Sequence, residues 1–468
     1  MREIIQKRKA EIFLGIILLA FVTGNIIAIT RNNIPDWDES VYIGMGKYIF
    51  SWGNAGEWEL LRPLPLALLA GLSWKIGLNP IYAGKIIGVL FSVLNIILTY
   101  KIGKELFSKK AGLFAAFFLA ITPVFFSFSN KILTEMPSVF FTLLALWLLI
   151  KNKNILLVGV CAGISFLVKF PNGLFMIVLA ALLLLYAKKE KTGMKPVYMC
   201  IAGFGIAILP FIVFNLFMYG NELNPLEAMF RPMLSAAGVH SNPFYPGGLL
   251  FYVTGLLKTN PFLVFSIAGL FFLFKRKDFN IQKTLPVAYV IASMLYFSII
   301  VDIKDLRFAL LFLPFLAVLA GHGAVEIARY KRIGYAILAV MLIAAIPAAY
   351  YGITRSNYLS EPSVRELKEF FSYFNNHPTN GIVLTTLPYP MAYSDARFRS
   401  IFYVGASPEQ ILKGVSAAIL LPSALKCTEH DLECIKMKES FFKGIYERGK
   451  PVASIKYWED NLTIYLIS

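Results

Sequence analysis

The sequence predicts an α-helical membrane protein of about eleven transmembrane helices, followed by a small extracytoplasmic α/β domain. The first of three observations is composition. Of the 468 residues, 57% are hydrophobic and only 16% are charged, whereas soluble domains are about one quarter charged. The second is a series of apolar segments about as long as a bilayer requires. The third is a change near residue 352, after which charged residues, proline and short β-like runs become frequent.

The apolar segments give the order of the predicted spans. The first follows a basic N-terminus and has no evident small-residue cleavage site, so we expect an anchor and not a removed signal peptide. Several of the others are short for a hydrocarbon core of about 30 Å. The segments lie near residues 11–29, 81–100, 111–128, 133–150, 154–169, 172–187, 197–218, 260–274, 285–301, 307–325 and 333–352.

Lysine and arginine set the expected orientation in the plasma membrane. Their clusters fall in alternate turns between the spans, on the side of the N-terminus, and the opposite turns carry only scattered basic residues. The positive-inside rule therefore places the N-terminus in the cytoplasm, and an odd number of spans places the C-terminal domain outside. The same rule accounts for the net charge of +17, and no basic segment carries a nucleic-acid-binding motif, so we expect no nucleic-acid partner.

Two domains are expected, a transmembrane domain over 1–352 and an α/β domain over 353–468. Residues 363–376 predict an amphipathic helix, with Ser363 as its cap and Glu366 three residues later. The expected strands lie at 381–386, 398–404, 415–421 and 462–467.

The cysteines of the C-terminal domain leave two alternatives open. Cys427 and Cys434 lie seven residues apart on the expected oxidising side of the membrane, so either a disulfide or two free thiols would fit.

The first outer loop, residues 30–80, begins with the stretch DWDESVYIGMGKYIF, whose acids are Asp36, Asp38 and Glu39. Acidic residues next to a bilayer are costly, so a functional site is the first hypothesis for them. The apolar spacing over 39–53 predicts a short amphipathic helix that lies along the interface. A second interfacial helix is expected over 62–77, and together the two would cover a cavity open to lipid and water.

Basic residues stand at the outer ends of predicted spans. Cations at this boundary suit an anionic lipid head group such as a phosphate, for which arginine offers a planar fork of donors. Snorkelling toward water is the plainer explanation for any single one of them, but several cations together with carboxylates on one face favour a binding site. The residues are Arg62, Lys169, Lys304 and Arg307.

Several motifs, taken in order, resemble those of the C-type (GT-C) glycosyltransferases. The resemblance is to the branch of the dolichyl-phosphate-mannose protein mannosyltransferases and the lipid A aminoarabinose transferases. Asp38-Glu39-Ser40-Val41-Tyr42 is similar to the family's D-E-x-x-Y, and Arg62-Pro63-Leu64-Pro65-Leu66 to its basic-P-x-P-L. The further matches are NKILTEMPSVFF (130–141), FLVKFPNGLF (166–175), KDLRFALLFLP (304–314) and, less closely, NPFYPGGLLFYV (242–253). Three residues depart from the family pattern: Glu135, where Asp is commoner, Phe170, where Gly is, and Phe308, where Tyr is.

The resemblance implies an enzyme that takes a sugar from a dolichyl or undecaprenyl phosphate and transfers it, with inversion, to a protein, lipid or glycan acceptor. Transfer on the extracytoplasmic face needs a base to accept the acceptor's proton, and Asp38 is the expected one. Glu39 is expected to hold the loop or the acceptor. The donor phosphate is expected to bind Arg62, Lys169 and Arg307, together with Lys304.

Substrate contacts are further expected at Tyr42, Glu135 and Tyr245. No cofactor is required by this interpretation, and no nucleotide-binding glycine-rich loop is present. Asp36-Trp37-Asp38 is also a D-x-D, so a divalent metal held by Asp36 and Asp38 is an open alternative. The other interpretation of Asp36 is a helix cap.

Two other classes of protein are weighed against an enzyme. A polytopic lipid or glycolipid transporter or flippase would also have many spans, but it should show internal repeats and acids near the middle of the membrane. A membrane scaffold that uses the C-terminal domain for binding would tolerate the loss of Asp38.

Overall fold

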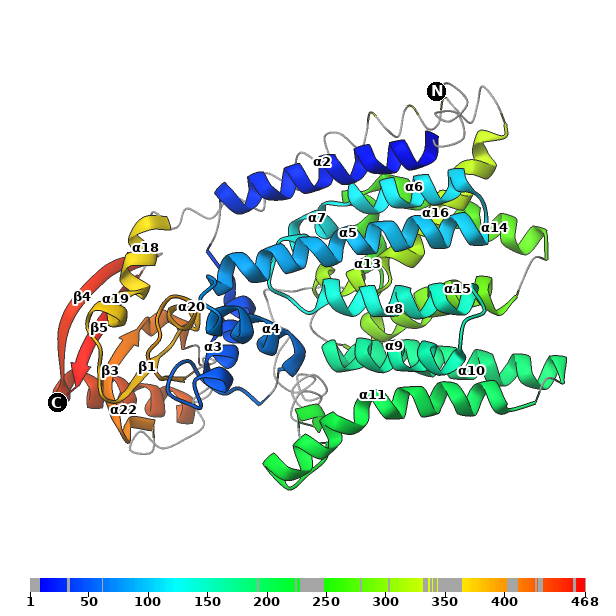
Figure 1. The fold of residues 1–468 in the computed structure, drawn as a ribbon. Helices are drawn as coiled ribbons and strands as arrows, with labels where there is room; N and C mark the ends of the chain where they lie inside the picture. Colours follow the sequence, from blue (N-terminus) through cyan, green and yellow to red (C-terminus); the bar gives the residue numbers. More distant parts are fainter. Residues whose placement is uncertain are drawn as a thin grey trace. The chain divides into compact units, whose positions relative to one another are not determined.

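The computed structural model describes two compact units (Figure 1). The helical unit comprises Met1–Ala28, Leu61–Pro63 and Ile87–Asn357, and the sheet unit comprises Ile29–Leu60, Leu64–Ile86 and Tyr358–Ser468. The described residues are 9–31, 34–60, 62–191, 193–223, 225–227, 248–277, 280–301, 304–330, 336, 339, 343, 364–401, 411–425, 427, 432–457 and 460–467.

The described part of the helical unit consists of helices throughout, joined by short turns. The α-helices are α2 (Lys9–Arg31), α5 (Pro80–Leu106), α6 (Lys109–Ala120), α7 (Pro123–Ser129), α8 (Glu135–Ile150), α9 (Ile155–Val168), α10 (Gly173–Glu190), α11 (Lys195–Tyr219), α13 (Phe251–Thr259), α14 (Phe265–Lys275), α15 (Ile281–Leu295) and α16 (Leu313–Ala328). The shorter turns are η1 (Phe170–Asn172), η2 (Pro261–Val264), the π-helix η3 (Tyr296–Ile300) and η4 (Leu306–Leu311). Helices α2 and α5 each run across a unit boundary.

Local sequence explains where these helices begin. Ser108 caps α6 by accepting a hydrogen bond of 3.1 Å from the Ala111 N–H, and Asn154 caps α9 in the same way. Pro123 opens α7, because proline fits the first helical turn but disfavours a helical residue before it. As a result α6 and α7 are bent by 68° at their break.

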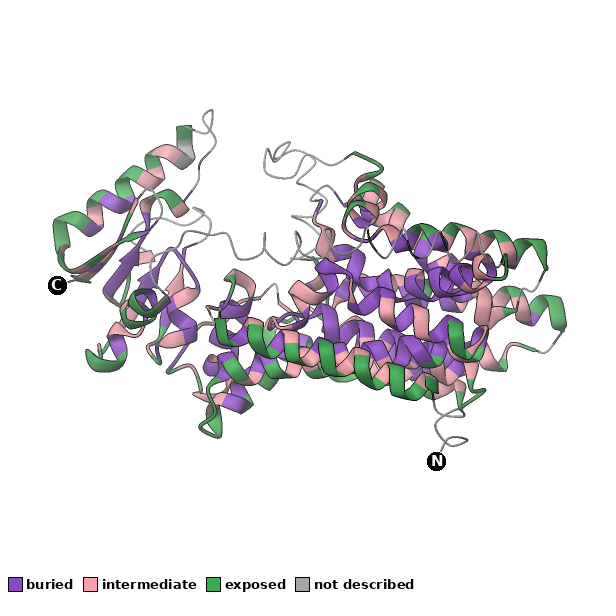
Figure 2. Cartoon of the chain, turned by 90° about the horizontal axis from the view of Figure 1, so that it is seen from above, coloured by how far each residue is buried: buried purple, intermediate pink, exposed green. Residues whose placement is uncertain are grey.

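Small residues let the helices approach closely. A Cβ atom on Gly159 of α9 would overlap the carbonyl of Cys200 in α11, and one on Gly203 of α11 would overlap the carbonyl of Leu156. Such contacts between backbones are typical of helices packed within a bilayer. Figure 2 shows buried positions between these helices and exposed positions on their outer faces.

The protein is a multi-pass membrane protein. Among the described residues, five helices are long and apolar enough to cross a membrane, or six if α6 and α7 form one span. Helices α8, α9 and α16, and η2 with α14, are apolar but shorter. The first ten predicted spans fall on helices, and the last, 333–352, lies almost entirely outside the described residues. The number eleven stays a prediction.

The sheet unit contains a mixed five-stranded sheet in the order β2-β1-β3-β5-β4. Strands β2, β1 and β3 are parallel, and β5 runs antiparallel to both β3 and β4. The strands are β1 (Ile382–Thr385), β2 (Phe398–Ser400), β3 (Val415–Leu420), β4 (Gly449–Tyr457) and β5 (Asp460–Ile467). The helices are α3 (Trp37–Phe50), α4 (Leu64–Lys75), α18 (Val364–Phe371), α19 (Tyr373–Asn376), α20 (Tyr389–Tyr393), η5 (Pro422–Ala424) and α22 (Leu432–Arg448).

Alternation along the central strands builds a core on each face of the sheet, because successive side chains point to opposite sides. Ala417 and Ile419 of β3 join one apolar cluster, to which α18 contributes Leu367 and Phe371. Ala418 and Leu420 join the other, to which α22 contributes Phe441, Phe442 and Ile445.

Most of the strands and helices of the C-terminal domain agree with the predictions from the sequence. Each of the four predicted β-like runs contains a strand, and the helix predicted over 363–376 is present as α18 and α19. Strand β4 and helix α22 were not predicted. The sheet unit also includes the first outer loop, which composition assigned to the transmembrane domain 1–352. That boundary stays a prediction, because composition does not report contacts between distant segments.

Helix α3 forms where the first interfacial helix is expected, but it is not a one-sided surface helix. Its residues Glu39–Lys47 are all buried, whereas Trp52, just beyond its end, is 91% exposed. Glycines explain the burial, because a Cβ atom on Gly46 would lie 2.5 Å from the Ala67 carbonyl oxygen of α4. The two helices of the loop thus pack backbone to backbone.

The cysteines divide into two kinds. Cys161 and Cys200 in the helical unit are buried free thiols. Cys427 is disulfide-bonded, and the side chain of Cys434 lies outside the described residues.

Candidate functional site

The helical unit holds a buried ion pair at the ends of two helices. Glu135 is the first residue of α8, and Lys169 is the C-cap of α9. The Lys169 Nζ atom lies 2.8 Å from Glu135 Oε1, and the two side chains are only 13% and 3% exposed. A carboxylate at a helix N-terminus is favoured by the helix dipole, and Lys169 supplies the opposite charge. Both residues were predicted from the sequence as site residues, and the structure joins them.

The second oxygen of Glu135, Oε2, is buried and has no hydrogen-bond partner among the described residues. A buried acceptor in this condition costs about 1–3 kcal/mol. A substrate hydroxyl that donates to Oε2 would remove that cost. The carboxylate is therefore fixed on one side by Lys169 and able to accept a hydrogen bond on the other.

Arg307 stands beside this pair on η4. The Asp305 carboxylate holds Arg307 by two contacts. Its Oδ1 atom accepts a hydrogen bond from the Arg307 backbone N–H at 2.9 Å, and its Oδ2 atom lies 3.0 Å from the Arg307 Nε atom. The ring of Phe308 supports both cations, with its centroid 5.7 Å from Lys169 Nζ and 5.5 Å from Arg307 Cζ. Two cations therefore lie beside one aromatic ring, which offers no hydroxyl, because Phe308 stands where the family commonly has tyrosine.

A buried polar network lies next to the Glu135–Lys169 pair. Ser165 donates to the Ser138 carbonyl at 2.8 Å and lies 2.6 Å from the Thr142 hydroxyl, so it joins α9 to α8. Asn172 of η1 donates to Ser165 at 2.8 Å and accepts from Tyr289 of α15 at 3.1 Å. Satisfied polar networks of this kind specify a single packing of the helices that carry the pair. No sequence pattern indicated this network, because its members lie in four separate elements.

Lys304 was predicted to bind the donor phosphate, but its ammonium group serves a helix end. It donates to the carbonyls of Phe297 and Ser298, each at 2.9 Å, and to that of Val301. An ammonium has three N–H donors, and these three carbonyls close the end of η3. This geometry favours a C-cap role, so we leave Lys304 out of the proposed phosphate site.

The acids of the first outer loop lie at the start of α3, in the sheet unit. Asp36 is the N-cap, and its backbone N–H donates to Glu39 Oε2 at 2.6 Å, which forms a capping box. Asp38 is half-buried in the first turn, and Tyr42, one turn later, is buried. The structure thus uses Asp36 and Glu39 to begin the helix that carries Asp38.

The metal alternative, a divalent ion held by Asp36 and Asp38, stays a prediction. The described residues include no group of three or more His, Cys, Asp or Glu side chains able to hold a metal ion. Asp36 and Glu39 already form the capping box, so we derive no step through a metal.

Lys47 and Glu57 form buried polar contacts that sequence reasoning missed. Lys47 Nζ lies 2.8 Å from Asp395 Oδ1, and burial lowers the pKa of this ammonium against the attraction of Asp395. Glu57 accepts hydrogen bonds from the backbone N–H of Ser400 at 2.7 Å and from its hydroxyl at 2.5 Å. Burial raises the pKa of Glu57, and the two Ser400 donors oppose that shift. A lone lysine after the apolar run that follows the first turn of α3 was the available signal for the first contact.

Two further residues were predicted from the sequence to bind the substrates, Arg62 and Tyr245. Arg62 is half-buried and belongs to the helical unit. Tyr245 lies outside the described residues.

Comparison with known proteins bears on both units. A sequence model of the dolichyl-phosphate-mannose-protein mannosyltransferase family matches residues 62–214. The structure of ArnT from Cupriavidus metallidurans bound to undecaprenyl phosphate is similar, with a TM-score of 0.63 over 96% of this chain and 97% of that one, at 11% identity. The apo oligosaccharyltransferase of Archaeoglobus fulgidus also reaches 0.63, at 13% identity, over 89% of this chain and 70% of that one.

The chain shares the fold of ArnT and of the archaeal oligosaccharyltransferase, and about one third of it matches the mannosyltransferase family model.

A third similar structure is the archaeal oligosaccharyltransferase AglB of Archaeoglobus fulgidus in complex with an inhibitory peptide and a dolichol-phosphate. It matches with a TM-score of 0.58 and 13% identity, over 96% of this chain and 73% of that one. No curated protein matches the sequence. The stretch matched by the family includes Arg62, Glu135 and Lys169, and it leaves out Asp38 and Arg307. The fold that the sequence motifs predict is therefore confirmed, while the roles of single residues stay predictions.

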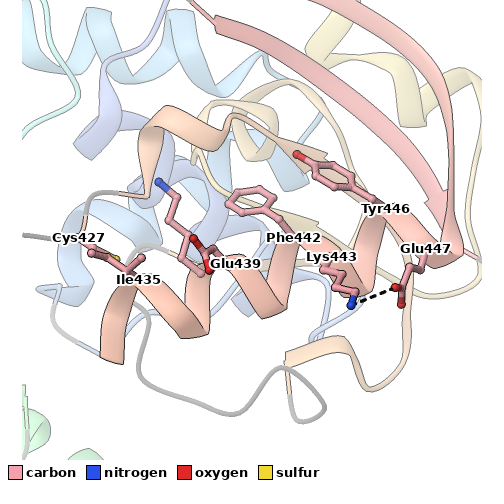
Figure 3. Close-up of a pocket in the computed structure, with 8 residues that line it drawn as sticks. Cys427, Ile435, Glu439, Phe442, Lys443, Tyr446 and Glu447 are labelled. Atoms are coloured by element: carbon pink, nitrogen blue, oxygen red, sulfur yellow. Dashed lines mark ion pairs between the residues drawn. The ribbon is translucent and has the colours of Figure 1, made fainter. Parts of the chain in front are cut away.

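Two hollows on the described surface of the sheet unit are further candidate sites. One, of about 740 Å³, lies along α22 (Figure 3). Its lysines are already engaged, since Lys438 donates to the Leu425 carbonyl at 2.6 Å and Lys443 lies 3.9 Å from Glu447. The other is a polar cleft of about 710 Å³ whose lining includes Asn375, Asp395 and Arg397.

Proposed function

We propose that this protein is a membrane glycosyltransferase that moves a sugar from a polyprenyl phosphate to an acceptor at the extracytoplasmic face of the plasma membrane. The observation that carries the proposal is the Glu135–Lys169 pair with Arg307 over Phe308, in a chain whose fold matches ArnT bound to undecaprenyl phosphate over nearly its whole length. A phosphate ester needs fixed cations where it binds, and an acceptor hydroxyl needs a carboxylate.

The proposed reaction is a single displacement. The acceptor's nucleophilic atom forms a bond to the anomeric carbon, and the bond from that carbon to the phosphate oxygen breaks with its electron pair staying on the phosphate. The acceptor's proton passes to Asp38 as general base. Arg62, Lys169 and Arg307 stabilise the charge that develops on the leaving phosphate, because donors held in place before the reaction need no reorganisation during it.

Glu135 is assigned to substrate binding in this scheme. Its Oε2 atom accepts a hydroxyl of the sugar or acceptor, while Lys169 holds Oε1. The substitution of Glu for the commoner Asp extends this carboxylate by one methylene. Tyr42, for which a substrate contact was predicted from the sequence, is buried one turn from Asp38, and in this scheme it supports the helix that carries Asp38.

The test is sugar transfer from polyprenyl-phosphate sugars by the purified protein, with mannose, glucose and aminosugar donors. We expect transfer by the wild type and its loss in Asp38→Asn, a drop on the order of a hundredfold or more for removal of a general base. Asp36→Asn is the matched control, since it alters a neighbouring acid and should keep most activity unless the pair holds a metal. Loss of activity in both variants and on adding EDTA would replace the metal-free scheme with a metal-dependent one.

The runner-up is a lipid or glycolipid transporter of the same topology. It is favoured if the purified protein binds polyprenyl phosphate but releases no sugar from any donor, and if reconstituted vesicles move the lipid between leaflets. Glu135 lies at a helix end, and Asp38 and Glu39 lie in the first outer loop, which favours the transferase.

A further inference from the structure

We propose that the C-terminal domain positions α3, the helix that carries Asp38, through an anchor made by Lys47, Gly56 and Glu57. The proposal deepens the proposed function and rests on it in one respect, the assignment of Asp38 as the base. Lys47 and Glu57 are positioning residues here, and neither is expected to touch the substrate.

Lys47 is the first part of the anchor. Its side chain is 2% exposed, and its ammonium donates to the Ser394 carbonyl at 2.9 Å and the Ala392 carbonyl at 3.4 Å besides pairing with Asp395. A buried ammonium is tolerated only when its donors are satisfied, so a shift of α3 against this segment would leave Lys47 buried without its partners. The indole of Trp74 in α4 donates to the same Asp395 oxygen at 3.1 Å, so both loop helices meet at one carboxylate.

The second part is a strand-like contact. The Gly56 N–H donates to the Ala396 carbonyl at 2.8 Å, and the Gly56 carbonyl accepts from the Phe398 N–H at 2.9 Å. Together with the Gly56–Arg397 bridge, these bonds lie along β2, which is the edge strand of the sheet. A segment that pairs with an edge strand satisfies its open hydrogen-bonding groups and fixes the register of both. Glu57 then adds its two bonds from Ser400.

Glycine packing makes the anchor stiff. A Cβ atom on Gly44 of α3 would lie 2.7 Å from the sulfur of Met391 in α20, and one on Gly56 would overlap the Gly44 carbonyl. Gly56 also has a φ of +71°, which side-chain-bearing residues rarely adopt. The turn after α3 is thus pressed against the helix on one side and paired with β2 on the other.

Helix geometry explains why this contact acts through α3 and not on the substrate directly. Lys47 follows Asp38 by nine residues, which is about 14 Å along the axis and half a turn around it. The anchored face is therefore opposite the face of Asp38. Misplacement of a reacting group by about 1 Å is enough to cost on the order of a hundredfold in rate. A shift at the Lys47 face of the helix can therefore slow a reaction at the Asp38 face.

The competing explanation is acceptor recognition by the C-terminal domain. Asp395 also lines the polar cleft with Asn375 and Arg397, and a cleft of this size could receive part of an acceptor. The two explanations differ in the kinetic parameter that they affect. An anchor changes kcat for every acceptor, whereas a recognition cleft changes KM for the acceptors that enter it.

The experiment compares Lys47→Met, Asp395→Glu and Arg397→Gln with the wild type, using the full chain in detergent and two unrelated acceptors. We expect Lys47→Met to lower kcat by roughly ten- to a hundredfold for both acceptors with KM nearly unchanged. Asp395→Glu keeps the charge and should retain most of kcat. Arg397→Gln changes only an exposed side chain of the cleft and keeps the backbone bridge to Gly56, so it should leave kcat unchanged.

A kcat of Lys47→Met equal to that of the wild type would overturn the anchor. So would effects of Asp395→Glu and Arg397→Gln confined to the KM of one acceptor, which would establish the cleft instead. A second measurement is independent of activity: hydrogen exchange of the α3 amides should be faster in Lys47→Met and unchanged in Arg397→Gln. If the wild type transfers no sugar, the proposed function fails, and the exchange rates still decide whether the anchor exists.

Discussion

At the scale of single residues, the Glu135–Lys169 pair shows how one contact can serve both structure and chemistry. The pair is buried at the meeting of two helix ends, and its charges neutralise each other with Arg307 close by. Removing one partner of a buried pair leaves the other charge without compensation, which costs more than the net contribution of the pair. The pair therefore has consequences for stability that can be measured without knowing the substrate.

We predict that Lys169→Met lowers the free energy of unfolding by roughly 3–5 kcal/mol, because it leaves Glu135 buried and unpaired. The double variant Lys169→Met/Glu135→Gln should recover part of this loss. The measurement is unfolding in detergent by heat or denaturant. Lys151→Met is the matched control, since the Lys151–Glu105 pair is about one third exposed and should contribute less than about 1 kcal/mol. Equal losses at both positions would contradict a buried, structurally important pair.

Glu57 leads to a prediction about pH. The pKa of Glu57 is raised in the folded protein, so the folded protein binds this proton more tightly than the unfolded chain does. The stabilisation that comes from this tighter binding is present below the unfolded pKa of about 4.3, and it is lost as the pH rises through the folded pKa. The stability of Glu57→Gln relative to the wild type should therefore increase from about pH 4 upward, because glutamine stays neutral.

The measurement for Glu57 is unfolding of both proteins across the acidic range. Glu447→Gln serves as the control, because Glu447 is 63% exposed and lies in a surface pair with Lys443. Its difference from the wild type should show no comparable rise. A flat difference for Glu57→Gln would mean that Glu57 is not held at a cost in the folded protein.

At the scale of elements, the sequence predicted structure where one pattern decides it. Long apolar runs predicted the helices of the membrane domain, and the runs around β1, β3 and β5 predicted strands. Helix α22 was missed because its apolar residues alternate with Lys and Glu, and β4 because it is mostly exposed and contains Pro451.

For the candidate site, the sequence predicted individual residues but not the contacts between them. Chemistry and motifs indicated Asp38, Glu135, Lys169 and Arg307, because charged residues beside a bilayer need a reason. The partners could not be predicted, since Lys47 and Asp395 are 348 positions apart and only the fold brings them together. The role of Lys304 was missed for a related reason, because a motif does not show which carbonyls a helix end leaves open.

The packing of α3 on α4 gives a prediction at this scale. A methyl group at Gly46 would lie 2.5 Å from backbone atoms of Ala67 and Gly71, so Gly46→Ala must push the two helices apart. We expect a loss of about 1–3 kcal/mol in the free energy of unfolding, together with reduced transfer. Gly15→Ala, at a helical glycine with no atom within 4 Å of the added carbon, should be neutral or more stable by up to about 1 kcal/mol. Gly46→Ala with full stability would show that the helices are not in backbone contact.

At the scale of the whole molecule, the proposed chemistry depends on which side of the membrane the first outer loop faces. The polyprenyl phosphate, the base and the C-terminal domain act together only if residues 30–80 and 353–468 share one side. Most of residues 30–80 belong to the same compact unit as the C-terminal domain, so the two share one side, and the positive-inside rule predicts that this side is the outer one. The number of crossings depends on α6 and α7. The bend of 68° between them makes the third predicted span either a broken crossing or a re-entrant segment.

Two single cysteine substitutions decide this topology. Trp52 is 91% exposed in the first outer loop, and Lys153 is exposed between α8 and α9, with three predicted spans between them. We expect a membrane-impermeant maleimide to label Trp52→Cys in intact cells and Lys153→Cys only after permeabilisation. The native Cys161 and Cys200 are buried and Cys427 is disulfide-bonded, so the background among these three should be low, and the wild type measures it directly. Labelling of both variants from outside would mean that α6 and α7 enter and leave by the same face, and the reverse pattern would place Asp38 in the cytoplasm and remove it as the base for extracytoplasmic transfer.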